Sequence, residues 1–107
     1  MARPAIHPGE HLAELLRELE MSAAALSRHL DVPTNRITAI ANGQRAITGD
    51  TALRLGHFFD TSPEFWLNLQ KQYELRQAEA KVGADVRALP TLSATRGKVG
   101  SDQRRAA

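Results

Sequence analysis

Cysteine is absent from the 107 residues of this chain, and so are long apolar runs. Without cysteine the chain can form neither a disulfide framework nor a zinc site with thiolate ligands, so a reducing compartment is the natural setting. No stretch approaches the roughly 20 apolar residues of a membrane span, and the first residues contain no run of signal-peptide length. We therefore expect a soluble, cytoplasmic protein with one domain and a modest core.

A strong excess of either charge is also lacking, since the formal net charge is only +2. This total hides an asymmetry: residues 1–75 contain 7 Lys+Arg and 9 Asp+Glu, whereas residues 76–107 contain 7 and 3. The first part therefore carries −2 and the second part +4. If the first part binds a polyanion, it must depend on a few well-placed cations.

Signatures of catalysis are missing too, because the chain has no nucleophile elbow, acid pair or Gly-rich phosphate loop. The nearest pattern is H-x-x-E-H, formed by His7, Glu10 and His11, which resembles an inverted zinc-peptidase motif. That motif needs both histidines on consecutive turns of one helix, yet Pro8 and Gly9 put His7 at or before the helix start. No third ligand lies at a suitable spacing, so we expect no enzyme activity, no metal and no other cofactor.

The most informative segment is residues 22–43, which predicts two short helices joined by a tight turn. Asp31 interrupts the first helix, and Pro33 fits only the opening turn of the second because its ring fixes φ and it has no N–H. A connection of about three residues between helices that share one core forces them to cross steeply, as in a helix-turn-helix unit. An ordinary αα-hairpin with a solvated polar face is the alternative. The apolar residues at helical spacing are Ala23, Leu26, Leu30, Val32, Ile37, Ile40 and Ala41.

The second helix of this unit leaves a polar face directed outward. Short side chains that donate and accept hydrogen bonds are what contact with base edges in a major groove requires, so we predict a double-stranded DNA interface here. The face consists of Thr34, Asn35, Arg36, Thr38, Ala39 and Asn42. Because the surrounding residues are net negative, we expect Arg28, Arg36 and Arg45 to make the phosphate contacts.

Three further helices are predicted, which gives an all-α fold of five helices. One opens at Pro8 and ends near Glu20, one follows Thr48 as its N-cap, and one runs from Ser62 to about Ala80. The helix after Thr48 is expected to bury Ala52, Leu53, Leu55, Gly56 and Phe59. The first helix also carries an acidic row, Glu10, Glu14 and Glu18, which is usually a solvated face.

The last predicted helix is apolar on more than one side. One face closes the core, and a second apolar face on the last helix of a small domain favours a homodimer. A two-fold dimer would set its two DNA-contacting helices one DNA turn apart, roughly 34 Å. The residues expected at the dimer interface are Phe65, Trp66, Leu69 and Tyr73, with a place in the core as the alternative for Trp66, Leu69 and Tyr73.

Beyond residue 80 the apolar pattern dissolves. We predict a DNA-binding and dimerisation domain over residues 1–80 and a flexible basic tail over residues 81–107. Disorder is expected from about Ala94, whereas residues 85–92 contain enough apolar residues to dock elsewhere.

Four runs of sequence carry a family resemblance: HPGEHLAELL, NGQRAIT, ALRLGHFF and SPEFWLNLQKQYEL. They span about residues 6–76, and through them the chain resembles the HigA, or VapI-type, antitoxins within the Xre, lambda-repressor-like group. The resemblance implies a dimeric antitoxin of a type II toxin–antitoxin module. Such a protein represses its own operon and neutralises a HigB toxin, a small basic RelE-like ribonuclease.

The resemblance also implies roles for individual residues. Base contacts fall to Thr34, Asn35, Arg36, Thr38 and Ala39, and DNA backbone contacts fall to Asn42 and Arg45. The chain departs from the family pattern at Ser27, Asp31 and Pro33, where alanine, glycine and serine or threonine are usual. The acidic row Glu10, Glu14 and Glu18 would complement a basic toxin, with the tail as the alternative docking site. A stand-alone Xre-type repressor without a toxin is the second hypothesis, and a small metal-dependent enzyme the third.

Overall fold

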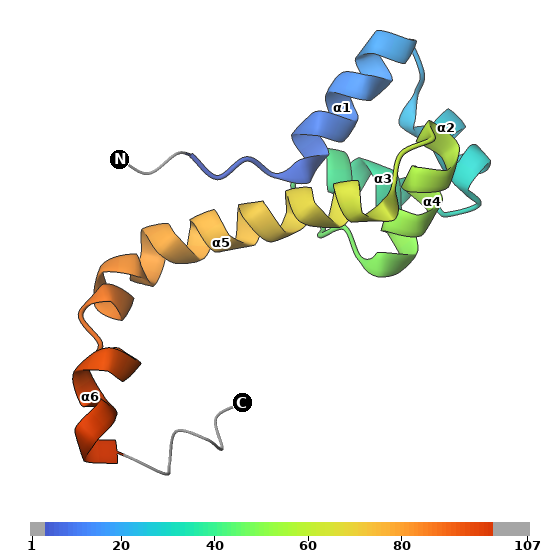
Figure 1. The fold of residues 1–107 in the computed structure, drawn as a ribbon. Coiled ribbons are helices and arrows are strands. Elements are labelled where there is room, and N and C mark those ends of the chain that lie inside the picture. The colour runs from blue at the N-terminus through green and yellow to red at the C-terminus, as the bar shows by residue number, and fades with distance from the viewer. Residues whose placement is uncertain (1–3, 100–107) are drawn as a thin grey trace. The chain divides into compact units, whose positions relative to one another are not determined.

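The computed structural model describes residues 4–99, and every regular element in that range is an α-helix, which confirms the predicted fold class (Figure 1). None of these helices is long and apolar enough to cross a membrane. The chain divides into two compact units, Met1–Gln77 and Ala78–Ala107, whose boundary lies inside α5. The elements are α1 (Pro8–Leu19), α2 (Ala23–Leu30), α3 (Thr34–Ala41), α4 (Gly49–Phe59), α5 (Pro63–Arg87) and α6 (Leu92–Val99).

Helix ends in the first unit follow the local sequence. Ser22 Oγ accepts a hydrogen bond from the backbone N–H of Ala25 at 3.0 Å, and Ser62 Oγ accepts one from Phe65 at 3.1 Å. Asp31 ends α2 in the left-handed conformation (φ 58°), which a short polar side chain tolerates better than a branched one. These caps leave a turn of three residues, Asp31 to Pro33, between α2 and α3.

A single apolar cluster joins the first four helices to the beginning of α5, and Figure 1 shows α1 to α4 gathered around the first turns of that helix. The α2–α3 pair supplies four of its members, as the periodicity predicted. The buried members are Leu12, Leu16, Leu26, Leu30, Ile37, Ile40, Ile47, Ala52, Leu55 and Trp66.

Trp66 corrects the predicted dimer interface. Its side chain is 0% exposed within a single chain, so it has no surface to offer a second copy. The indole N–H is satisfied internally, since it donates to Thr61 Oγ1 at 3.0 Å. Trp66 therefore belongs to the core, where an aromatic side chain buries the largest apolar area.

Two expectations, for α4 and for the end of α5, differ from the structure. Leu53 was predicted to be buried but is 63% exposed, because Thr51, Ala52 and Leu55 form the inner side of α4. Helix α5 continues to Arg87 rather than ending near Ala80, since the single glycine at position 83 weakens a helix without ending it.

A short helix, α6, occupies residues 92–99, where disorder was expected from about Ala94. Thr91 caps this helix through its side chain, which accepts the backbone N–H of Ala94 at 3.3 Å. Residues 100–107, the rest of the predicted flexible segment, lie outside the described residues.

Helix α1 meets α3 at Gly9. A Cβ atom at this position would overlap the carbonyl oxygen of Ile40, so only glycine permits the observed approach of the two backbones. The H-P-G-E run thus places a cap, a first-turn proline and a contact glycine in consecutive positions.

We expect Gly9→Ala to lower the free energy of unfolding by about 1 to 3 kcal/mol, because α1 must move away from α3. Gly49→Ala is the matched control: a Cβ there meets nothing within 4 Å, so stability should stay the same or rise by less than about 1 kcal/mol. Urea denaturation followed by circular dichroism measures both. Equal effects of the two substitutions would contradict the close contact.

Candidate nucleic-acid interface

The outer side of α3 brings the predicted base-contact residues onto one face. Thr34, Asn35 and Thr38 are exposed, whereas Arg36 and Ala39 are half-buried at its margins. Thr38 Oγ1 donates to the carbonyl oxygen of Thr34 at 3.1 Å, so its own lone pairs remain free to accept. The face therefore offers donors and acceptors of the kind that base edges recognise.

Two of the three family departures, Ser27 within α2 and Pro33 at the start of α3, fit the fold. Ser27 is buried, and its hydroxyl donates to the carbonyl oxygen of Ala23 at 2.7 Å, which satisfies the buried group. Pro33 is the N-cap of α3 and makes no side-chain cap hydrogen bond. Neither substitution disturbs the α2–α3 geometry.

The segment after α3 is held against α5. Asn42 and Arg45 are exposed there, but Ile47 is only 2% exposed. The backbone N–H of Ile47 donates to Gln70 Oε1 at 2.9 Å, and Gln70 Nε2 donates to Glu74 at 2.8 Å. Gln70 was not predicted as a site residue. The only signal for it in the sequence is a polar side chain one helical turn after Trp66, on the same side of the helix.

Arg36 is not a free side chain. Its Nη1 atom lies 3.2 Å from Asp50 Oδ1, and Arg54 Nε lies 2.8 Å from the same oxygen. The hydrogen bond from Arg54, helped by the charge of both arginines, lowers the pKa of the Asp50 carboxyl below its usual value. Neither Asp50 nor Arg54 was among the site residues predicted from the sequence.

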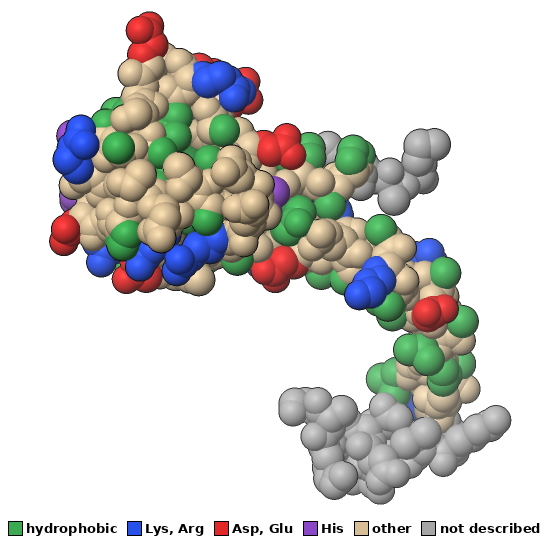
Figure 2. Space-filling model, turned by 180° about the vertical axis from the view of Figure 1, so that it is seen from behind, with side chains coloured by type: hydrophobic (Ala, Val, Ile, Leu, Met, Phe, Trp, Pro, Cys, Tyr) green, Lys and Arg blue, Asp and Glu red, His purple; other side chains and the backbone are tan. Residues whose placement is uncertain are grey.

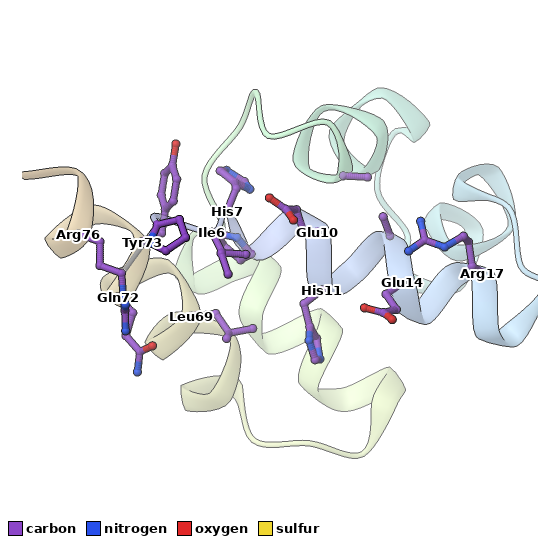
Figure 3. A pocket seen from close by; sticks show the side chains of 14 residues that line it. Ile6, His7, Glu10, His11, Glu14, Arg17, Leu69, Gln72, Tyr73 and Arg76 are labelled. Atoms are coloured by element: carbon purple, nitrogen blue, oxygen red, sulfur yellow. The ribbon is translucent and has the colours of Figure 1, made fainter. Parts of the chain in front are cut away.

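A groove of about 650 Å³ lies between α1 and the first half of α5, and Figure 3 shows its lining side chains. Glu10 and Glu14 of the predicted toxin-binding row line it, and so do Leu69 and Tyr73 of the predicted dimer interface. Glu18 and the half-buried Phe65 do not. The two predicted protein-binding surfaces therefore overlap.

His7 is the N-cap of α1, which agrees with its predicted place at or before the start of that helix. Its Nδ1 atom accepts the backbone N–H of Gly9 at 2.9 Å, and its ring packs edge-on against Tyr73. Burial lowers the pKa of His7 below its ordinary value, opposed by a hydrogen bond to the backbone of Arg45 and by the charge of Glu10. Within residues 4–99 no three His, Cys, Asp or Glu side chains are grouped so that they could hold a metal ion.

We expect His7→Asn to flatten the pH dependence of stability. Folding disfavours protonation of His7, because burial lowers its pKa and a protonated Nδ1 could not accept the Gly9 N–H. The unfolded chain binds the proton more readily, so this contribution is complete above about pH 6.5 and is lost as pH falls through the lower folded pKa. Asparagine still caps a helix but does not titrate.

The measurement is the free energy of unfolding at intervals between pH 7.5 and 5 for both proteins. The wild type should lose stability toward pH 5 relative to His7→Asn, with the other histidines common to both. Parallel curves would contradict the assignment.

These features define a helix-turn-helix protein. Four helices surround one core, a three-residue turn joins α2 to α3, and α3 directs a polar face outward. The family model for the helix-turn-helix family HTH_3 matches residues 12–66. Virulence-associated protein I of Dichelobacter nodosus is 49% identical over 77 residues, which cover 71% of each chain. Antitoxin HigA-1 of Vibrio cholerae is 31% identical over 68% of this chain and 70% of its own.

Solved structures agree with these relatives. A HigA-family antidote protein from Coxiella burnetii superposes with a TM-score of 0.81 and 56% identity, covering 83% of this chain and 98% of that one. Antitoxin HigA of Pseudomonas aeruginosa, solved with the higBA promoter, gives a TM-score of 0.78 and 44% identity, covering 82% and 98%. The chain belongs to the HTH_3 helix-turn-helix family and, within it, to the HigA, or VapI-type, antitoxins.

Proposed function

We propose that this chain is an antitoxin that represses its own operon and neutralises a HigB-type toxin. The observation that carries the DNA-binding part is the exposed polar face of α3, held in place by the short turn and the buried α2–α3 core. The likeness to Pseudomonas aeruginosa HigA, which was solved with its promoter, supports the same part. A stand-alone repressor without a toxin is the second candidate, because the relatives also include HTH-type transcriptional regulators.

The charge distribution favours sequence-specific contact over general attraction to DNA. Residues 1–75 carry a net charge of −2, and in Figure 2 the basic side chains along the lower edge of the globular part have acidic side chains beside them. Few phosphates would then be neutralised, and log K should fall by only about 0.9 per log unit of salt for each of them. Specificity would come from α3 and from the few arginines beside it.

We expect Arg36→Ala to weaken binding to the DNA upstream of the chain's own gene by about 1 to 3 kcal/mol and to relax base preference at one position. Arg17→Ala, which removes the same charge from the end of α1, is the control and should have a smaller effect. Fluorescence anisotropy with the upstream duplex and a random duplex measures both. An equal loss on random DNA would assign Arg36 to phosphate instead of a base.

The proposed dimer uses Leu69 and Tyr73, together with the exposed part of Phe65. All three are half-buried in the monomer, so each retains apolar surface for a second copy. A two-fold axis through this surface would pair two α3 helices for successive major grooves, roughly 34 Å apart. Glu10 and Glu14 would then lie at the rim of the same interface.

The proposed toxin contact uses the acidic row of α1. Glu10, Glu14 and Glu18 are exposed and separated by one helical turn each, so they present negative charge along one side of α1. A basic toxin would be attracted to this row mainly through a faster association rate.

We expect Glu14→Lys together with Glu18→Lys to slow association with the toxin by about tenfold at low salt. The control is Glu64→Lys combined with Asp85→Lys, which makes the same charge change at two exposed positions of α5. The partner is the product of the neighbouring gene, and binding is followed by biolayer interferometry and by rescue of growth on co-expression.

Equal slowing by both pairs would contradict a role for the α1 row. Growth that no form of the chain rescues, with no binding to the neighbouring product, would favour the stand-alone repressor.

A further inference from the structure

A carboxylate beside a DNA-contacting arginine is unexpected, because it opposes attraction to phosphate. Asp50 occupies that place: it lies in the first turn of α4, and its Oδ1 atom is 3.2 Å from Arg36 Nη1. We propose that Asp50 is a positioning residue that sets DNA specificity, holding Arg36 in the orientation for base contact and lowering its attraction to phosphate. This inference rests on the proposed DNA binding.

The position of the Asp50 carboxylate is itself fixed. Arg54, one turn further along α4, donates from Nε to Asp50 Oδ1 at 2.8 Å. The other end of its guanidinium donates from Nη1 to the carbonyl oxygen of Leu30 at 2.7 Å and lies 3.3 Å from that of Asp31. Arg54 therefore links the carboxylate to the C-terminal end of α2, which is part of the rigid core.

The result is a bridge in which Asp50 Oδ1 joins α4 to Arg36 of α3, and Arg54 extends the link from that oxygen to the end of α2. Its side chains are partly exposed, at 25% for Arg36, 58% for Asp50 and 37% for Arg54, so it lies at the surface rather than in the core. Surface ion pairs add little to stability, which makes a purely structural role a weak explanation for this arrangement.

The pairing leaves Arg36 able to contact a base. A guanidinium has five N–H donors, and a bidentate contact with guanine uses two of them, so one hydrogen bond to Asp50 does not exhaust the group. A phosphate contact depends more on free positive charge, which the nearby carboxylate reduces. Among the described residues, Arg28 and Arg45 have no such carboxylate partner, so of the three arginines predicted to contact phosphate only Arg36 is paired with Asp50.

The test compares wild type and Asp50→Asn on two probes of equal length: the duplex upstream of the chain's own gene and a random-sequence duplex. We expect affinity for the random duplex to rise by about threefold, and the ratio of specific to random affinity to fall by about tenfold. Asp50→Glu, which keeps the carboxylate, should restore part of that ratio.

Glu64→Gln is the matched control. Glu64 is an exposed acid in the first turn of α5, the equivalent helix position, and has no basic partner within 4 Å among the described residues. Removing its charge should leave the ratio within about twofold of the wild type. Arg54→Lys keeps the charge but not the forked geometry, so we expect it to lower the ratio in the same direction as Asp50→Asn.

The outcomes separate the two proposals. If wild type binds the upstream duplex no better than the random one, DNA recognition itself fails, and the role of Asp50 falls with it. A second outcome is that the wild type binds the upstream duplex more tightly than the random one, but Asp50→Asn and Arg54→Lys keep the wild-type ratio of specific to random affinity. Only the role of Asp50 is then overturned. A thermal melt confirms that each variant is folded, and Arg54→Lys decides the question should Asp50→Asn unfold.

Discussion

The three residues between α2 and α3 are the constraint on which the outward polar face of α3 depends. Asp31 can take the left-handed conformation that ends α2, and Pro33 stands where α3 begins. A turn this short gives the apolar sides of both helices only one place to pack, against α1, α4 and the first turns of α5. The polar side of α3 must then face outward. Gly9 contributes to the same packing, because the absence of a side chain lets α1 approach the end of α3 closely.

The charges suit the proposed contact with specific bases better than a general attraction to DNA. Residues 1–75 are net negative, and one of the three arginines in and just after the helix-turn-helix unit is paired with a carboxylate. Affinity would then come from oriented side chains and, in the proposed dimer, from two copies acting together. The acidic row on α1 lies on a different helix from the base-contact face, so a basic partner and DNA could be attracted to separate parts of one small domain.

Much of the fold could be predicted from the sequence because it is local. Ser22, Asp31 and Ser62 end or cap helices through atoms a few residues away. Features that join distant residues could not be predicted: Arg54 reaches the carbonyl of Leu30, 24 residues earlier, and Gln70 reaches Ile47, 23 residues earlier. The choice between core and dimer interface for Trp66 could not be made from the sequence for a related reason. Helix α5 is apolar on more than one side, and only the packing of the other helices decides which side is covered.

The central claim is that the face of α3 recognises the DNA upstream of the chain's own gene. Nitrogen-15 NMR of the full chain, titrated with that duplex, tests it most directly, because every backbone amide reports separately. We predict the largest shift changes at residues 34–45 and in the first turn of α4, with the acids of α1 little affected. Changes confined to the groove between α1 and α5, with residues 34–45 unaffected, would contradict the account.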